Sequence, residues 1–92
     1  MKIKIKEATA KKHMARVAGL GCLACGGQAQ VHHIRLNMEK NDMNVIPLCH
    51  EHHTGSFSIH TTPREFQNSA GSQLELLAKT NAMLLELDLG II

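Results

Sequence analysis

Two short stretches decide the fold of this 92-residue chain: Cys22-Leu-Ala-Cys25 and Cys49-His-Glu-His52. Within each stretch, two residues separate the two possible ligands, so both side chains can reach one metal ion. Zn²⁺ prefers four nitrogen or sulfur ligands in a tetrahedron, and the two stretches together supply four. The spacing therefore predicts a structural zinc site that uses all three cysteines of the chain. Three unrelated buried cysteines are the less favoured alternative.

The composition indicates that the domain would need the stabilisation that a bound zinc ion supplies. The chain has no Trp, no Tyr and only two Phe, so a single small domain would have a thin core. A bound zinc ion would stabilise it directly. Three Cys beside seven His do not suit a disulfide scaffold. No signal peptide and no membrane-spanning apolar run is visible, so we expect no membrane contact and a cytoplasmic location, in a reducing compartment.

Charge is unevenly distributed along the chain. Residues 1–16 carry six Lys or Arg against one Glu, a net +5, and residues 17–92 carry four against seven acids, a net −3. This asymmetry favours contact with a polyanion, and a solvated, partly disordered N-terminus is the alternative. We expect residues 1–16 to form a basic arm and the start of a first helix, and residues 17–92 to form one domain.

Local patterns predict an α+β fold. Residues 8–18 favour a helix that ends at Gly19, residues 30–34 favour a strand, and a short extended run at residues 45–46 turns at Pro47. From Thr62 on the chain is predicted helical, with capping-box patterns that begin at Thr62 and at Ser72. The last helix is expected to pack on the core, or alternatively on a partner, through residues at helical spacing: Leu74, Leu77, Ala78, Leu84 and Leu85.

Several histidines remain after one is assigned to zinc. His32 and His33 are adjacent in the predicted strand, so they should point to opposite faces, and one could hold a metal while the other faces a substrate. His53 directly follows His52, and in a helix it would project about 100° away from it. His53 could therefore turn toward His32.

Together these motifs resemble the HNH (ββα-metal) endonucleases that carry a zinc clip around the catalytic hairpin. The residues that carry the resemblance are the two cysteine stretches, Val31-His32-His33-Ile34, and the run from Asn44 to His53. More narrowly, the chain is similar to the phage recombination-enhancement (Ref-type) nucleases that act with RecA filaments. The resemblance implies a small zinc-stabilised ββα-metal domain, treble-clef-like, with flanking helices. It also implies hydrolysis of DNA phosphodiester bonds, at recombination intermediates in the narrower case, in a bacterial or phage-infected cell.

The resemblance also assigns roles to residues. His33 would be the general base, and Asn44 would brace the backbone that aims it. His32 and His53 would hold a catalytic divalent cation (Mg²⁺, Mn²⁺, Ni²⁺ or Zn²⁺), and His60 would either complete that site or lie beside it. The zinc ligands would be Cys22, Cys25, Cys49 and His52, although His52 and His53 could exchange roles.

A neutral histidine is a suitable base near pH 7, because its ordinary pKa is about 6.5. Basic side chains would neutralise flanking phosphates without reading the bases. The candidates for that role are Arg35, Lys11, Lys12 and Arg16. The expected partners are DNA and, from the narrower resemblance, a RecA filament, with the oligomeric state open. The alternative is a non-catalytic zinc-binding module for nucleic acid or protein, which should tolerate His33→Ala.

Overall fold

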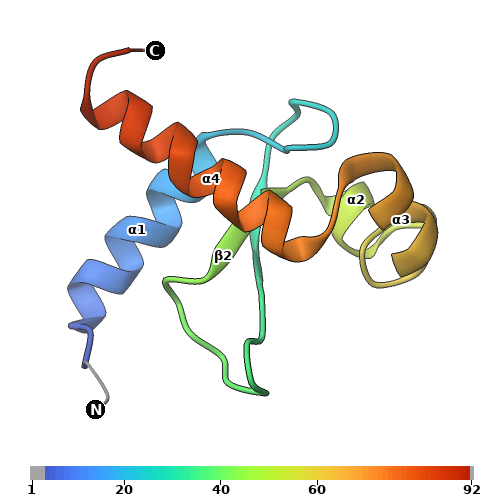
Figure 1. Cartoon of the computed structure of the whole chain (residues 1–92), viewed down its shortest axis with the longest axis horizontal. Coiled ribbons are helices and arrows are strands. Elements are labelled where there is room, and N and C mark those ends of the chain that lie inside the picture. The colour runs from blue at the N-terminus through green and yellow to red at the C-terminus, as the bar shows by residue number, and fades with distance from the viewer. Residues whose placement is uncertain (1–3, 92) are drawn as a thin grey trace.

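A two-stranded antiparallel sheet lies at the centre of the chain (Figure 1). The computed structural model describes residues 4–91, so Lys2 of the expected basic arm lies outside the described residues. Strand β1 spans Gln30–His33 and strand β2 spans Val45–Leu48. In the register of the pair, His32 lies opposite Ile46 and His33 opposite Val45. The two histidines are thus held on a paired strand, on opposite faces of the pleat.

Residues 4–91 contain four helices in addition to the sheet. Helix α1 (Glu7–Gly19) and helix α4 (Gln73–Asp88) both pack against β2, while the short α2 (His50–Thr54) follows β2 directly and α3 (Pro63–Ala70) lies between α2 and α4 in the chain (Figure 1). The predicted α+β class is confirmed. The expected boundary between residues 16 and 17 lies inside α1.

An ion pair and a shared apolar contact join the two long helices. The Arg16 guanidinium of α1 lies 2.5 Å from the Asp88 carboxylate of α4. Val17 and Leu84, one from each helix, pack with Val45 of β2 in one buried cluster. The first and last helices are therefore tied to each other and to the sheet.

The main core lies on the other side of β2. Phe66 of α3 is its largest fully buried side chain, and it packs with Ile46 and Leu48. Cys22 belongs to the same buried cluster, so one predicted zinc ligand is part of the core.

The predicted apolar face of the last helix is only partly correct. Leu77 and Leu84 are buried as expected, but Leu74 and Leu85 are 60% and 58% exposed. The buried face differs from the predicted one because Leu76, as well as Leu77, packs in the cluster that contains Phe66 and the β2 side chains. It consists of Leu76, Leu77, Thr80 and Leu84.

Of two local predictions about turns and caps, one is wrong and one is partly correct. β2 continues through Pro47, since proline is tolerated in a two-stranded sheet where one edge needs no ladder hydrogen bond. The strand does not end at Pro47, whose carbonyl accepts a hydrogen bond from the Leu23 N–H at 3.1 Å. Thr62 is the N-cap residue of α3 with Pro63 at the first helical position, as predicted, but its hydroxyl makes no capping bond, because the Ser58 N–H donates to it at 3.1 Å.

The capping box predicted at Ser72 is confirmed. The Ser72 hydroxyl accepts from the Glu75 N–H at 3.1 Å, and the Glu75 carboxylate accepts from the Ser72 N–H at 3.0 Å. This start places Gln73 at the first position of α4, where it faces β1. Within residues 4–91, no helix has the length and apolarity needed to cross a bilayer.

Candidate metal centres

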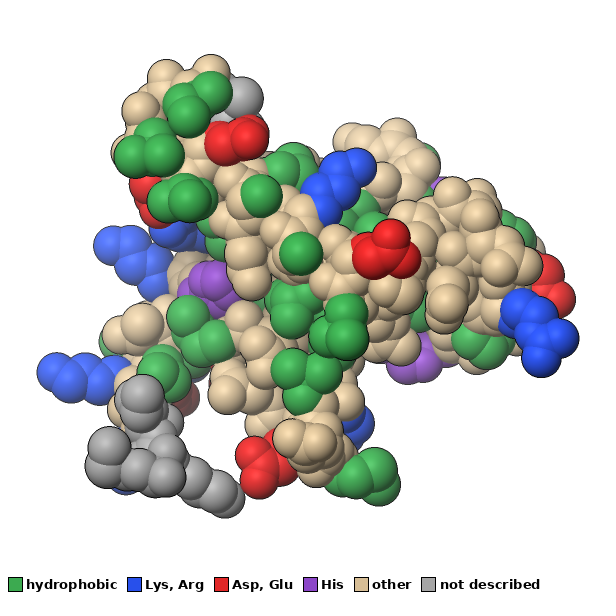
Figure 2. Space-filling view, in the orientation of Figure 1, with side chains coloured by type: hydrophobic (Ala, Val, Ile, Leu, Met, Phe, Trp, Pro, Cys, Tyr) green, Lys and Arg blue, Asp and Glu red, His purple; other side chains and the backbone are tan. Residues whose placement is uncertain are grey.

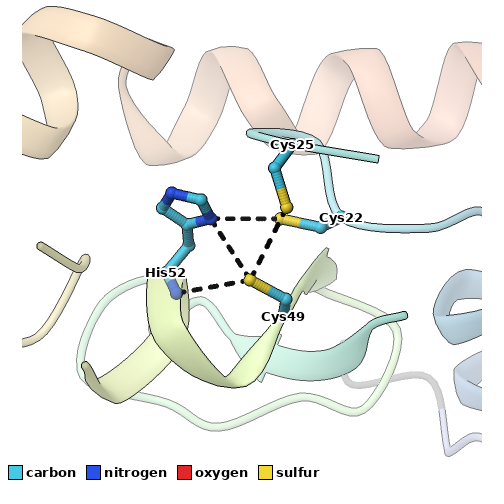
Figure 3. Close-up of side chains that lie close together, drawn as sticks. All are labelled: Cys22, Cys25, Cys49 and His52. Carbon is cyan, nitrogen blue, oxygen red and sulfur yellow. Dashed lines mark hydrogen bonds between the residues drawn. The ribbon is translucent and has the colours of Figure 1, made fainter. Parts of the chain in front are cut away.

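Three cysteines and one histidine converge at the start of α2 (Figure 3). Their ligand atoms all lie within 4.8 Å of one another. The Cys25 Sγ is 3.7 Å from the Cys49 Sγ, and the His52 Nδ1 is 3.2 Å from the Cys49 Sγ. His52 Nδ1 also lies 3.7 Å from the Cys22 Sγ. This Cys3His cluster can hold a metal such as zinc, whose structural sites use this donor set.

A tight turn delivers the first two ligands. The Cys22 N–H donates to the Gly27 carbonyl at 2.8 Å, and the Gly26 N–H donates to the Cys22 carbonyl at 2.7 Å. Gly21 has φ +86°, and a Cβ placed there would lie 3.3 Å from the Gly26 carbonyl oxygen. Only glycine adopts this conformation at little cost, so Gly21 allows the turn to close.

The other two ligands come from the junction of β2 and α2. Cys49 is the N-cap of α2, and its sulfur accepts from the His52 N–H at 3.5 Å. The helix start therefore brings Cys49 and His52 to the same point.

The environment of the sulfurs favours a bound cation. Burial alone would raise the pKa of the Cys22 thiol, but N–H groups of Cys49, Ala24 and Cys25 and the His52 ring together lower that pKa to about 6. The pKa of Cys25 is raised, since the Gly27 N–H that lowers it is outweighed by the neighbouring Cys22 and Cys49 sulfurs. Several thiolates so close together repel one another unless a metal ion neutralises them.

A second cluster lies on the other side of α2 and consists of His32, His53 and His60. Their ligand atoms are also within 4.8 Å of one another, and their ring centroids are 4.9 to 5.1 Å apart. His32 is 7% exposed, whereas His60 is exposed to solvent. Three imidazoles suit Zn²⁺, Ni²⁺ or another borderline cation, and three protein ligands leave a position open to water or substrate.

The first ligand of this cluster is neutral at ordinary pH. Burial lowers the pKa of His32 to about 4, against the opposing effect of its hydrogen bond to Gln73, and the nearby His53, His60 and His33 lower it further. Burial also lowers the pKa of His53, as do His60 and His50. A neutral imidazole keeps the lone pair that a metal ion needs.

Two glutamines hold these imidazoles, and neither carries a signal in the sequence. The Gln73 Oε1 lies 3.3 Å from the His32 Nε2, and because a carbonyl oxygen can only accept, that nitrogen carries the proton. His32 then has its lone pair on Nδ1. The Gln30 Nε2 lies 2.7 Å from the His53 Nδ1 and, since an amide nitrogen can only donate, this bond uses the Nδ1 lone pair, so His53 would lose the bond on binding a cation. A partner such as Gln73 orients a metal-binding histidine, and only the fold reveals it, since Gln73 is 41 residues from His32.

The turn before α3 brings His60 to the cluster. The Ile59 N–H donates to the His52 carbonyl at 2.9 Å, so this turn is tied to α2. The Glu51 carboxylate accepts hydrogen bonds from the N–H and the hydroxyl of Ser56, both at 3.0 Å. These two bonds, together with a bond from the Phe57 N–H, lower the pKa of Glu51. The segment between α2 and α3 is thereby folded back, and His60 reaches His32 and His53.

His33 lies outside the cluster but next to it. Its Nε2 is 2.8 Å from the Asp42 Oδ1, in the loop that connects the strands. Although neighbouring strand residues alternate, both His32 and His33 border one open hollow of about 220 Å³. The hollow is lined by Val31, His32, His33, Arg35, Lys40, His53 and His60.

The backbone of Asn44 contributes to this geometry. Its carbonyl accepts from the Ile34 N–H at 2.9 Å, and its N–H donates to the Asn41 carbonyl at 2.9 Å. These bonds hold the loop against the end of β1, next to His33. Within residues 4–91 no hydrogen bond of the Asn44 side chain is found.

Of the four basic residues predicted to bind nucleic acid, only Arg35 borders this hollow. Lys11 pairs with Glu7 at 3.2 Å, and Arg16 pairs with Asp88. Lys12 and Arg16 line a separate hollow along α1. Lys40, for which the sequence carries no signal, also borders the histidines from the loop between the strands.

Fold and site thus define a small α+β domain with two candidate metal centres, one of cysteines and histidine and one of histidines alone. The chain belongs to the family described as protein of unknown function (DUF968), which matches residues 1–89. Comparisons with curated proteins and with solved structures gave no match.

Proposed function

We propose that this protein is a metal-dependent DNA endonuclease of the HNH type. One observation carries the proposal: three histidines that could hold a cation share a hollow with a fourth histidine, His33, and with the cationic side chains of Arg35 and Lys40. Phosphodiester hydrolysis needs an aimed water molecule, a base, and positive charge at the phosphate.

His33 is suited to act as the base. The Asp42 carboxylate can only accept, so the 2.8 Å contact places the proton on Nε2 and leaves the Nδ1 lone pair to take a proton from water. Asp42 also restrains the ring. Arg35 and Lys40 would hold the phosphate by charge, which involves no reading of the bases.

His32, His53 and His60 would hold the catalytic cation. When bound, the cation would supply positive charge at the phosphate and at the departing 3′ oxygen. Imidazole ligands favour Zn²⁺, Ni²⁺ and Mn²⁺ over Mg²⁺, which prefers oxygen.

The element order supports the same class. An antiparallel hairpin that leads directly into a helix, with ligands from strand and helix, is the arrangement that the ββα-metal resemblance implies. The Cys3His cluster would be its structural zinc clip. A RecA filament as a partner, and a place in the cytoplasm, follow from the narrower resemblance and are part of the proposal.

Plasmid nicking tests the proposal. Wild type, His33→Ala and the control His50→Ala are compared with Mn²⁺, Ni²⁺, Zn²⁺ or Mg²⁺, each with and without a RecA filament. His50 is exposed on α2 and belongs to neither cluster. We expect His33→Ala to lower the nicking rate by about 10²- to 10⁴-fold, since that is the usual contribution of a general base, while His50→Ala cuts like wild type.

Bound zinc, measured on each protein, shows whether the Cys3His cluster is intact. If folded, zinc-loaded wild type retains DNA on a gel but cuts it in no lane, the non-catalytic binding module replaces the nuclease. Cutting only in the lanes with RecA would support the narrower proposal.

A further inference from the structure

We infer that a cleft next to the histidine hollow binds a single DNA strand and leads it to the site. This inference rests on the proposed function for the identity of the reacting strand, but the binding itself does not depend on cleavage. The cleft has a volume of about 650 Å³ and lies between the start of α1 and the loop of residues 40–43.

The cleft and the histidine hollow are neighbours. Lys40 lines both of them, so a chain that lies in the cleft can continue past Lys40 to the histidines. Met43 in turn lines both the cleft and the hollow beside Lys12 and Arg16. The cleft and the hollow beside Lys12 and Arg16 therefore follow one another along α1, a helix about 20 Å long, while Lys40 connects the cleft to the histidine hollow.

The charge of the cleft suits phosphate. Its cationic residues are Lys4, Lys6 and Lys40, and none of them has an ion-pair partner among residues 4–91. The two acids that line it are engaged elsewhere: Glu7 pairs with Lys11, and Asp42 bonds to His33. With three Lys against two acids, the lining carries a net charge of +1. Figure 2 shows Lys and Arg side chains along the edge over α1.

The walls and floor favour a single strand over a duplex. Between the lysines the cleft is lined by apolar side chains, those of Ile5, Ala10 and Met43. In a single strand, the apolar faces of unstacked bases are available to such a surface while the phosphates contact cations. In a duplex the base faces are stacked inside and only phosphates and groove edges are presented, so the apolar floor would have no partner.

Fluorescence anisotropy with a labelled oligothymidylate of about 16 nucleotides, and with its duplex, tests this inference. Binding is measured without added divalent cation, across a range of salt concentrations, and a gel confirms that the DNA stays intact. The variants are Lys6→Gln, Lys40→Gln and the pair together. Lys79→Gln, an exposed lysine of α4 outside the cleft, is the control with the same change of charge.

For wild type we expect tighter binding of the single strand than of the duplex. Each single cleft variant should reduce the slope of log K against log salt by about 0.7, which corresponds to about a fivefold loss of affinity at 0.1 M salt. The double variant should reduce the slope by about twice as much. Lys79→Gln should change neither. Equal affinity for duplex and single strand, or an equal loss in Lys79→Gln, would overturn the inference.

The binding assay and the nicking assay can fail separately. If the plasmid is never cut but the cleft variants lose single-strand affinity as expected, the cleft is a DNA-binding site without the nuclease. If the plasmid is cut and the cleft variants bind the oligonucleotide like wild type, the nuclease stands and this path for the strand is wrong.

Discussion

Removal of the metal ion from the Cys3His cluster should unfold this domain. Cys22 is 4% exposed and packs in the same buried cluster as Phe66 and Leu48, so the site is continuous with the core. A metal that binds only the folded state stabilises it by mass action, with about 4.1 kcal/mol when the free ion is at 1,000 times its Kd.

The whole domain has little stability to lose. At about 0.05 to 0.15 kcal/mol per residue, a chain of 92 residues has roughly 5 to 14 kcal/mol. In a domain of this size, 1 kcal/mol shifts Tm by about 4 to 8 °C, so loss of the metal should lower Tm by at least about 16 °C. Structural zinc often binds more tightly, and complete unfolding at room temperature is then the expected result.

The assay follows the far-UV circular dichroism on heating, with and without a zinc chelator, and measures bound zinc in the same samples. Cys49→Ala should behave like chelated wild type. His60→Ala should keep its zinc and its Tm, because His60 belongs to the other cluster. If chelated wild type lost its zinc and melted within about 3 °C of the loaded protein, the Cys3His cluster would not stabilise the fold.

Three further changes test the surroundings of the site. Gln73→Ala should weaken binding of Zn²⁺ or Ni²⁺ at the histidine cluster by about 10- to 100-fold in a titration, while circular dichroism stays unchanged, because it removes the bond to His32 Nε2. Phe66→Ala should cost about 3 to 5 kcal/mol in urea unfolding, since Phe66 is 1% exposed. Glu75→Gln should be less stable than wild type near pH 7 and equally stable at low pH. The bond from the Ser72 backbone N–H lowers the pKa of Glu75. The Glu75 carboxylate therefore stabilises the fold above its ordinary pKa of 4.5, and this stabilisation is lost as the pH falls through the lowered pKa.

The elements with strong local causes could be predicted from the sequence. The strand at residues 30–33 and the capping box at Ser72 follow from residue types at fixed spacing. The Cys-x-x-Cys and Cys-x-x-His spacings indicated the Cys3His cluster for the same reason, since each pair lies within one turn of the chain. Such features need no information on how distant segments pack.

Features that depend on tertiary packing could not be predicted. The buried face of α4 is set by where Phe66 and β2 lie, so Leu85 is exposed although its spacing is helical. Threonine is a typical N-cap residue, but the Thr62 hydroxyl accepts a hydrogen bond from the Ser58 N–H and makes no capping bond. Lys40 borders the histidine hollow because of the conformation of the loop between β1 and β2, which the spacing of residues in the sequence does not predict.

One short helix couples the two candidate metal centres. In α2, His52 points to the cysteines and the adjacent His53 to His32 and His60, so the same five residues orient one ligand of each cluster. The Cys49 sulfur caps this helix, and a helix this short has little stability of its own. A metal on the Cys3His cluster would hold α2 in place, and with it both His53 and the turn that carries His60 through the Ile59 to His52 bond. The histidine cluster is therefore expected to form only when the first site is filled, which makes the structural metal a condition for the activity proposed at the second.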